Sequence, residues 1–187
     1  RPAGLSAFAA QLWKDAAGHF RALVSDDNCP PDIVAEAYFA YGGTYLSEDL
    51  PLTSAIQKYK DAKDMYSRAA RFTNGPIAAP AWGKIGECYL QMASYDPKQY
   101  AEATNAFLRV MTNAMADITI RSQAEWGLAK ALELYGPTVG ETVAFRKAAF
   151  DHYYNILIGE NLRDGEYPNP IWLEKAGLEA AHTIAAR

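Results

Sequence analysis

The chain has 187 residues, of which half are apolar and 21% are charged, and its formal net charge is -4. That much apolar sequence can bury a core in one domain and argues against a disordered chain. The chain contains no run of Lys or Arg and no apolar run of the ~18 residues that a membrane helix needs, so we expect neither a nucleic-acid binder nor a membrane span.

Helical spacing of apolar residues predicts eight helices. In chain order they cover residues 5–24, 32–47, 52–72, 79–93, 98–115, 118–135, 141–159 and 169–186. Pro30 and Pro76 follow the first and third of these helices and favour loops there, because proline cannot continue a helix. We therefore expect an all-α chain.

Four of these helices share one apolar face that includes a small residue. At 3.6 residues per turn, each set of four below falls on one side of its helix. The sets are Trp82, Ile85, Gly86 and Tyr89; Tyr38, Tyr41, Gly42 and Tyr45; Glu125, Leu128, Ala129 and Leu132; and, in degraded form, Leu173, Ala176, Gly177 and Ala180. Since Gly inside a helix costs about 1 kcal/mol relative to Ala, the small residue is predicted to mark a close contact between the two helices of a hairpin.

The intervening helices carry a second pattern, in which a small residue is followed after four positions by an aromatic residue and after three more by an apolar one. Its copies are Ala16, Phe20 and Leu23; Ala62, Tyr66 and Ala69; Ala103, Phe107 and Val110; and Ala149, Tyr153 and Ile156. The leading alanines recur every 41 to 46 residues. Self-similarity at such a period indicates a repeat protein, in which neighbouring helix pairs bury each other's apolar faces.

The central repeat resembles the tetratricopeptide repeat (TPR) signature W-x2-L-G-x2-Y followed by A-x3-F, through Trp82, Ile85, Gly86, Tyr89, Ala103 and Phe107. The resemblance covers nearly the whole chain and is weakest in the last repeat. The family repeat has 34 residues, so the extra length is expected between and inside the hairpins, in SEDLPLTSAIQ, QMASYDPKQ and LYGPTVGETV.

The resemblance implies a right-handed α-solenoid of antiparallel, TPR-like helix hairpins, with about eight helices in a single domain over residues 1–187. The implied repeats cover residues 1–30 in part, 32–76, 79–116 and 118–160, and a terminal helix covers 169–187.

Chemistry-bearing residues form no recognised set. His19 and His152 each precede the aromatic residue of a repeat, which favours a structural role, and His182 stands apart. Cys29 and Cys88 lack metal-ligand spacing and are too few for a disulfide framework, so free thiols are expected. Motifs for a serine nucleophile, a phosphate loop or a zinc protease are absent from the sequence. We therefore predict no catalytic residue, no metal site and no cofactor.

The resemblance also implies a concave surface that binds an extended peptide and is lined by the first type of helix. Rotated away from the buried face, the expected lining is Phe39, Gly43, Leu46, Gly83, Glu87, Gln91, Trp126, Lys130 and Glu133. Phe39 and Trp126 fit two interpretations, an anchor for the peptide or a buried residue in a shifted register. Only Lys130 fits the family's carboxylate-binding pattern, so a C-terminal carboxylate is not expected to bind in that manner.

These patterns favour a non-enzymatic scaffold that binds a partner protein or peptide, with a bacterial assembly or envelope complex as one setting; the periplasm or envelope and the cytoplasm both remain open. The alternative is a structural segment that self-associates through uncapped ends of the array. It is motivated by the apolar residues of the unpaired first helix, which are Leu5, Phe8, Leu12 and Trp13. A third hypothesis is an enzyme or small-ligand binder that uses the aromatic-rich groove.

Overall fold

The part of the chain that the computed structural model describes, residues 13–46 and 55–185, forms eight helices and no strand. The helices are α2 (Trp13–Val24), α3 (Pro31–Tyr45), α4 (Ala55–Ala69), α5 (Ala78–Ala93), α6 (Gln99–Met111), α7 (Ile118–Val139), α8 (Thr142–Ile158) and α9 (Pro170–Ala185). The prediction of an all-α chain is confirmed for these residues.

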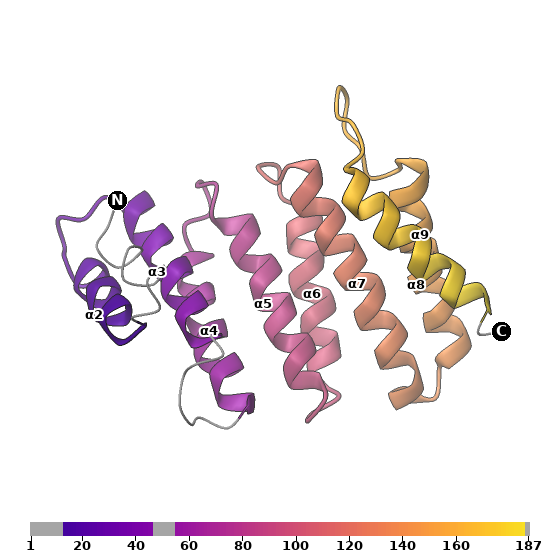
Figure 1. Ribbon diagram of the computed structural model, residues 1–187, viewed down its shortest axis with the longest axis horizontal. Coiled ribbons are helices and arrows are strands. Elements are labelled where there is room, and N and C mark those ends of the chain that lie inside the picture. The colour runs from indigo at the N-terminus through magenta and orange to yellow at the C-terminus, as the bar shows by residue number, and fades with distance from the viewer. Residues whose placement is uncertain (1–12, 47–54, 186–187) are drawn as a thin grey trace.

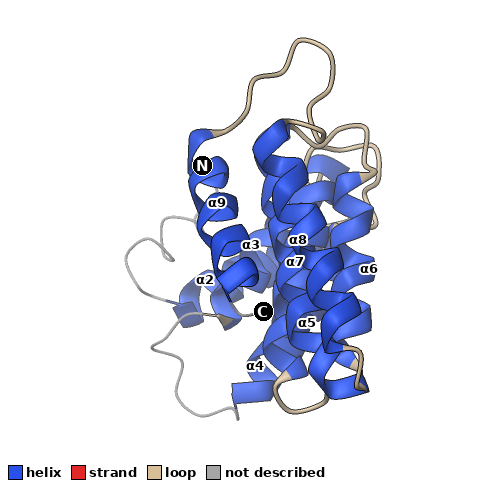
Figure 2. Ribbon diagram, turned by 90° about the vertical axis from the view of Figure 1, so that its right-hand side faces the viewer, coloured by secondary structure: helices blue, strands red, loops and turns tan. Residues whose placement is uncertain are grey.

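The helices follow one another along the long axis of the molecule, from α2 at one end to α9 at the other (Figure 1). Each helix packs against the helix before it and the helix after it, and α7 also contacts α5 and α9. The view at right angles shows a long connection between α8 and α9 that rises above the helices (Figure 2). The fold is therefore built mainly from contacts between consecutive helices.

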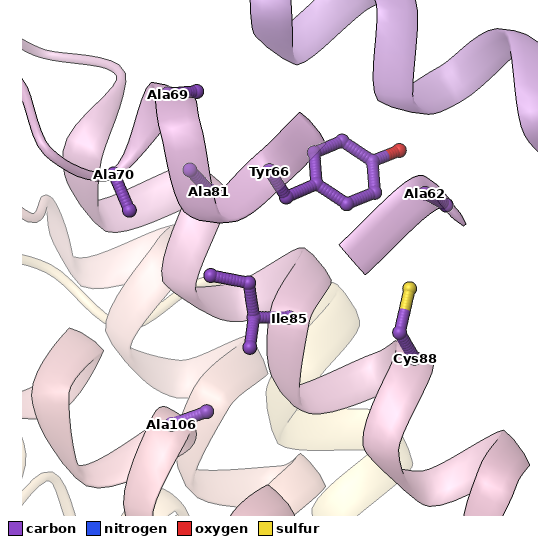
Figure 3. Packing of buried hydrophobic residues seen from close by; sticks show 8 residues of the cluster. All are labelled: Ala62, Tyr66, Ala69, Ala70, Ala81, Ile85, Cys88 and Ala106. Atoms are coloured by element: carbon purple, nitrogen blue, oxygen red, sulfur yellow. The ribbon is translucent and has the colours of Figure 1, made fainter. Parts of the chain in front are cut away.

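Buried apolar residues form clusters that succeed one another along the chain. One of them joins α4, α5 and α6 through alanines, Tyr66, Ile85 and Cys88, whose side chains converge in Figure 3. The next joins α5, α6 and α7 around Phe107, and a third joins α7, α8 and α9 around Tyr153. Because each cluster contains residues from neighbouring helices, burial of apolar surface stabilises the packing of each helix against the next.

The second sequence pattern marks buried positions in all four helices that carry it. Its aromatic residues Phe20, Tyr66, Phe107 and Tyr153 are buried, and so is every leading alanine. Leu23 is the one member that is only half-buried. Positions at this spacing lie on one side of a helix, which here is the side that packs against neighbouring helices.

The small residues of the first pattern lie against aromatic rings. A Cβ added to Gly86 would lie 2.6 Å from the ring of Phe107, and one added to Gly42 would lie 2.8 Å from the ring of Tyr66. Each ring comes from the following helix, so these glycines mark close contacts as predicted, with a ring as the neighbouring group. Gly177 is different, since a Cβ there would meet Leu157 at 3.5 Å, an ordinary contact distance.

Helix boundaries differ from the prediction by three or more residues at three places, and one of them is the helix predicted to end at residue 72, which ends at Ala69. The helix predicted to end at residue 115 ends at Met111, because the Asn113 side chain accepts a hydrogen bond from the Met115 N–H and holds a turn there. The helix predicted to end at residue 135 continues to Val139, so LYGPTVGETV is largely helical. Pro137 lies in the last turn, where it removes one N–H without ending the helix, and Gly140 terminates α7 in the left-handed region at φ 77°.

Some predicted features lie outside the described residues. They are the parts of the predicted helices at residues 5–12, 47, 52–54 and 186, together with Leu5, Phe8 and Leu12 of the proposed apolar end. Trp13 begins α2, but its side chain is also outside the described set.

Candidate binding cavity

A cavity of about 560 Å³, here named the central cavity, lies against α3, α4, α5, α6, α7 and α9 and is mainly apolar. Its lining residues are Phe39, Leu46, Tyr59, Pro80, Gly83, Lys84, Glu87, Cys88, Leu90, Gln91, Phe107, Ile120, Gln123, Ala124, Trp126, Gly127, Trp172 and Lys175. Its volume falls in the range of ligand-binding pockets, about 300–1,000 Å³. The central cavity is therefore large enough to hold several side chains of a bound segment.

Most of the predicted lining residues border this one cavity. Phe39 comes from α3, Leu46 follows α3 directly, Gly83, Glu87 and Gln91 come from α5, and Trp126 comes from α7. Positions predicted from three separate repeats therefore lie around a common space.

Lys130, Glu133 and Gly43 do not line the central cavity. The Lys130 Nζ donates hydrogen bonds to Glu179 Oε2 at 2.7 Å and to Glu133 Oε2 at 3.3 Å. The Tyr153 hydroxyl donates to the same Glu133 oxygen at 3.4 Å. Lys130 and Glu133 therefore join α7 to α8 and α9, because α9 covers the side of α7 that was expected to be open.

Phe39 and Trp126 each combine the two predicted environments, packing against a buried cluster and bordering the open cavity. The ring of Phe39 lies 5.3 Å from that of Tyr66, and the ring of Trp126 lies 6.0 Å from that of Trp172, measured between centroids. Each residue is half-buried and packs against a buried cluster, and each also borders the central cavity. Aromatic side chains in such positions present a fixed apolar surface to an occupant.

Glu87 is held in place between α5 and α7. The Lys84 Nζ lies 2.6 Å from Glu87 Oε2, and the Gln123 side-chain amide donates to Glu87 Oε1 at 3.0 Å. The negative charge at the middle of the central cavity is therefore already compensated, and both oxygens of Glu87 have a donor.

Lys175 stands at the α9 side of the same cavity. Its Nζ lies 4.4 Å from the ring centroid of Trp172 and 5.9 Å from that of Trp126. Among the described residues, no carboxylate forms an ion pair with Lys175. This exposed ammonium group thus lies on aromatic faces with its hydrogen-bond donors available.

The position of α9 is fixed by the connection at residues 159–169. The buried guanidinium of Arg121, at the start of α7, pairs with Glu166 and donates to the Asn161 carbonyl at 3.1 Å. The Arg163 guanidinium donates to the carbonyls of Asn113, Ala114 and Ala116 at 2.8 to 3.1 Å. These bonds hold the start of α9 against α7 and so place Trp172 and Lys175 beside Trp126.

The Cys88 thiol also borders the central cavity, but it is almost fully buried, and burial raises its pKa to about 12. A thiol with so high a pKa is neutral at physiological pH and is a poor nucleophile. Both Cys29 and Cys88 are free thiols in the structure.

The two histidines that share one place in the repeat have different surroundings. His19 is exposed, whereas His152 Nδ1 lies 3.1 Å from Glu125 Oε1, to which the Asn155 amide also donates at 3.2 Å. Within residues 13–46 and 55–185, no three His, Cys, Asp or Glu side chains are grouped so that they could hold a metal ion.

Sequence reasoning missed the contribution of α9. The predicted buried face of α9 begins at Leu173. Trp172 lies one position before Leu173 and Lys175 lies two positions after it, so neither follows the spacing used for the other helices. The pair Trp172 and Lys175, three residues apart on a helix, was the available signal, since such residues are neighbours on its surface.

Comparison of the chain with protein-family models, with curated proteins and with solved structures found no match. Of the helices described, none is long and apolar enough to cross a membrane. The chemistry of the central cavity, with apolar walls, a compensated Glu87 and a neutral thiol, suits binding of apolar groups better than proton transfer.

Proposed function

We propose that this chain is a non-enzymatic, TPR-like scaffold that binds an extended segment of a partner protein in the central cavity. One observation carries the proposal: six of the nine residues predicted from three repeats, Phe39, Leu46, Gly83, Glu87, Gln91 and Trp126, border a single space. Helical-repeat proteins commonly use such a surface to hold a partner.

Recurrent packing supports a right-handed α-solenoid of antiparallel hairpins as the architecture. The rings of Tyr66 and Phe107 lie on glycines of the preceding helices α3 and α5, so one contact is repeated in two successive helix pairs. The contacts of α7 with α5 and α9 favour a layer of alternate helices on one side of the array. In a stacked array, alternate helices approach one another in this way along the concave side.

An extended segment fits the central cavity better than a compact ligand does. The lining begins at Phe39 on α3 and ends at Lys175 on α9, so it runs across most of the helix row in Figure 1. Its apolar and aromatic side chains can receive successive side chains of a peptide, and a few polar groups, including Gln91, remain to bind main-chain atoms.

Selection from a random 12-residue peptide display library tests this proposal. We expect the folded chain to enrich peptides that bind it in solution and that lose about tenfold or more in affinity for Trp126→Ala, since a buried aromatic anchor commonly contributes 2 kcal/mol or more. The control is Tyr95→Ala, which removes an exposed aromatic side chain outside the central cavity. Absence of enrichment, or equal binding to Trp126→Ala, contradicts the proposal.

Self-association through the end of the array is a second candidate, favoured by apolar side chains on α8 and α9. Those exposed include Val143, Tyr154, Leu157, Ile158, Ile171 and Leu178, and Val143 is 82% exposed. Sedimentation velocity over a wide concentration range measures this association. A dimer that Leu178→Glu dissociates supports the candidate, and a monomer at the highest concentration contradicts it.

A further inference from the structure

We infer that the segment bound in the central cavity carries an acidic side chain and, further along the segment, a large apolar one, and that the acidic side chain pairs with Lys175. This inference rests on the proposed function and adds the chemistry and the direction of the partner segment. It is carried by the charges around Trp126 and by the contacts of Lys175 with the rings of Trp126 and Trp172.

Lys84 and Lys175 line the central cavity, and Lys130 lies outside it, 5.8 Å from the Trp126 ring; two of these three lysines are already paired. Lys84 pairs with Glu87 at 2.6 Å, and Lys130 pairs with Glu179 at 2.7 Å. Lys175 has only aromatic contacts among the described residues. The lining of the central cavity therefore keeps one uncompensated positive charge, although the chain as a whole is acidic.

The aromatic contacts orient Lys175 without using its donors. Its Nζ lies over the Trp172 ring at 4.4 Å, a distance at which the ring attracts the cation. All three N–H donors of the ammonium group remain for an occupant. A carboxylate is the acceptor that pairs most strongly with such a group, because hydrogen bonds between ionised partners are shorter and stronger than neutral ones.

Trp126 marks the part of the cavity where the acid would lie. Its half-buried ring borders the cavity, 6.0 Å from the ring of Trp172 and 5.9 Å from Lys175 Nζ. The Trp126 Nε1 is fully buried, so the donors offered to an occupant beside these two rings are those of Lys175.

The opposite end of the cavity is suited to a large apolar side chain of the same segment. Phe39, Leu46 and Tyr59 line the end formed by α3 and α4, where the lining has no charged residue. At the middle, Glu87 is neutralised by Lys84 and Gln123, so an acid is not repelled by an unpaired negative charge. The bound segment is thus expected to place its large apolar side chain toward α3 and its acid toward α9.

The experiment compares peptides selected from a random 12-residue display library on the wild-type chain with those selected on Lys175→Glu. The control is Lys98→Glu, which makes the same charge change at an exposed residue outside the central cavity. One enriched peptide is then synthesised with its acid as Asp, Asn or Lys. The Kd of each form is measured by quenching of tryptophan fluorescence, with thermal unfolding used to check that each variant is folded.

For the wild type we expect enrichment of peptides that contain Asp or Glu and, at a separate position, a large apolar residue. We also expect about tenfold weaker binding of the Asn form, as a charge-assisted hydrogen bond predicts. Lys175→Glu should remove this preference and favour the Lys form, whereas Lys98→Glu should not. Peptides that depend on Trp126 but show no preference for acid overturn this inference and leave the proposed function intact. No enrichment at all overturns both.

Discussion

Arg121 and Glu166 are joined by two hydrogen bonds between helix α7 and the connection that leads into α9. Arg121 Nη1 donates to Glu166 Oε1 at 3.1 Å, and Nη2 donates to Oε2. Only 4% of the Arg121 side chain is exposed, so the pair lies largely out of water. A paired guanidinium and carboxylate fix both distance and orientation, which explains how a long connection holds α9 in one place.

Glu166→Gln should destabilise the chain at neutral pH but not at low pH. The hydrogen bond from Arg121, followed by that from the Arg163 backbone N–H, lowers the pKa of Glu166 below its ordinary value of 4.5. A carboxyl group with a lowered pKa stabilises the fold above its ordinary pKa, and this contribution is lost as the pH falls through the folded-state value. The difference in thermal midpoint between wild type and variant should therefore shrink below pH 4.5.

Circular dichroism melts at pH 7, 5, 4 and 3 measure that difference. Glu160→Gln is the matched control, because Glu160 is exposed in the same connection and forms no ion pair among the described residues. A difference for Glu166→Gln that stays constant down to pH 3, or one equal to that of the control, would contradict the role assigned to the ion pair.

Gly86→Ala should destabilise the chain by about 1–2 kcal/mol, although alanine is the better helix former. The ring of Phe107 lies between two glycines, and an added Cβ would be 2.6 Å from it at Gly86 and 2.7 Å from it at Gly127. The ring cannot move away from one without approaching the other. Overpacking a buried site costs about 1–3 kcal/mol, which exceeds the gain of about 1 kcal/mol in helix propensity.

Gly18→Ala is the control for this prediction, because it makes the same change inside α2 with no atom within 4 Å of the added Cβ. It should stabilise the chain by about 0.5–1 kcal/mol. Urea unfolding gives both values. Equal effects of the two substitutions would show that Phe107 does not constrain Gly86.

The helices were predictable because their apolar faces repeat with aromatic and small residues at fixed places. The pattern predicted that Tyr66 and Phe107 would be buried and that Gly42 and Gly86 would be sites of close contact. The end of α7 was predicted wrongly at residue 135 because LYGPTVGETV was assigned to the extra length between and inside the hairpins, whereas Pro137 in the last turn removes only one hydrogen bond and the helix continues.

The candidate site was predictable only where the repeat is well formed. In α7, the sequence places Glu125 where the central repeat has Trp82. Lys130 and Glu133, which were expected on the open surface, are covered by α9, where Glu179 accepts a hydrogen bond from Lys130. The pairing of Arg121 with Glu166 joins residues far apart in sequence that belong to no repeated pattern. Helical periodicity identifies the face of a helix, but it does not identify which distant side chain meets that face.

Gly140→Ala should cost about 1–2 kcal/mol for a different reason from Gly86→Ala. Gly140 ends α7 with φ 77°, and no atom lies within 4 Å of an added Cβ, so crowding by neighbours is absent. The cost comes from the left-handed backbone, which residues with a Cβ adopt unfavourably. Gly140→Asn should cost less, since Asn tolerates this conformation better. Urea unfolding that ranks Asn and Ala equally would contradict this explanation.

Cys88 should react with a thiol reagent only when the chain unfolds. Its side chain is 1% exposed and burial raises its pKa to about 12, so at pH 8 it is both inaccessible and protonated. Cys29 is half-buried in the connection before α3, and its thiol should be the one that reacts in the native chain.

With Ellman's reagent at pH 8, we expect one equivalent of thiol per chain in buffer and two in denaturant. Cys29→Ser should abolish the native reaction, and Cys88→Ser should leave it unchanged; rapid labelling of native Cys29→Ser would contradict the burial of Cys88 against α4.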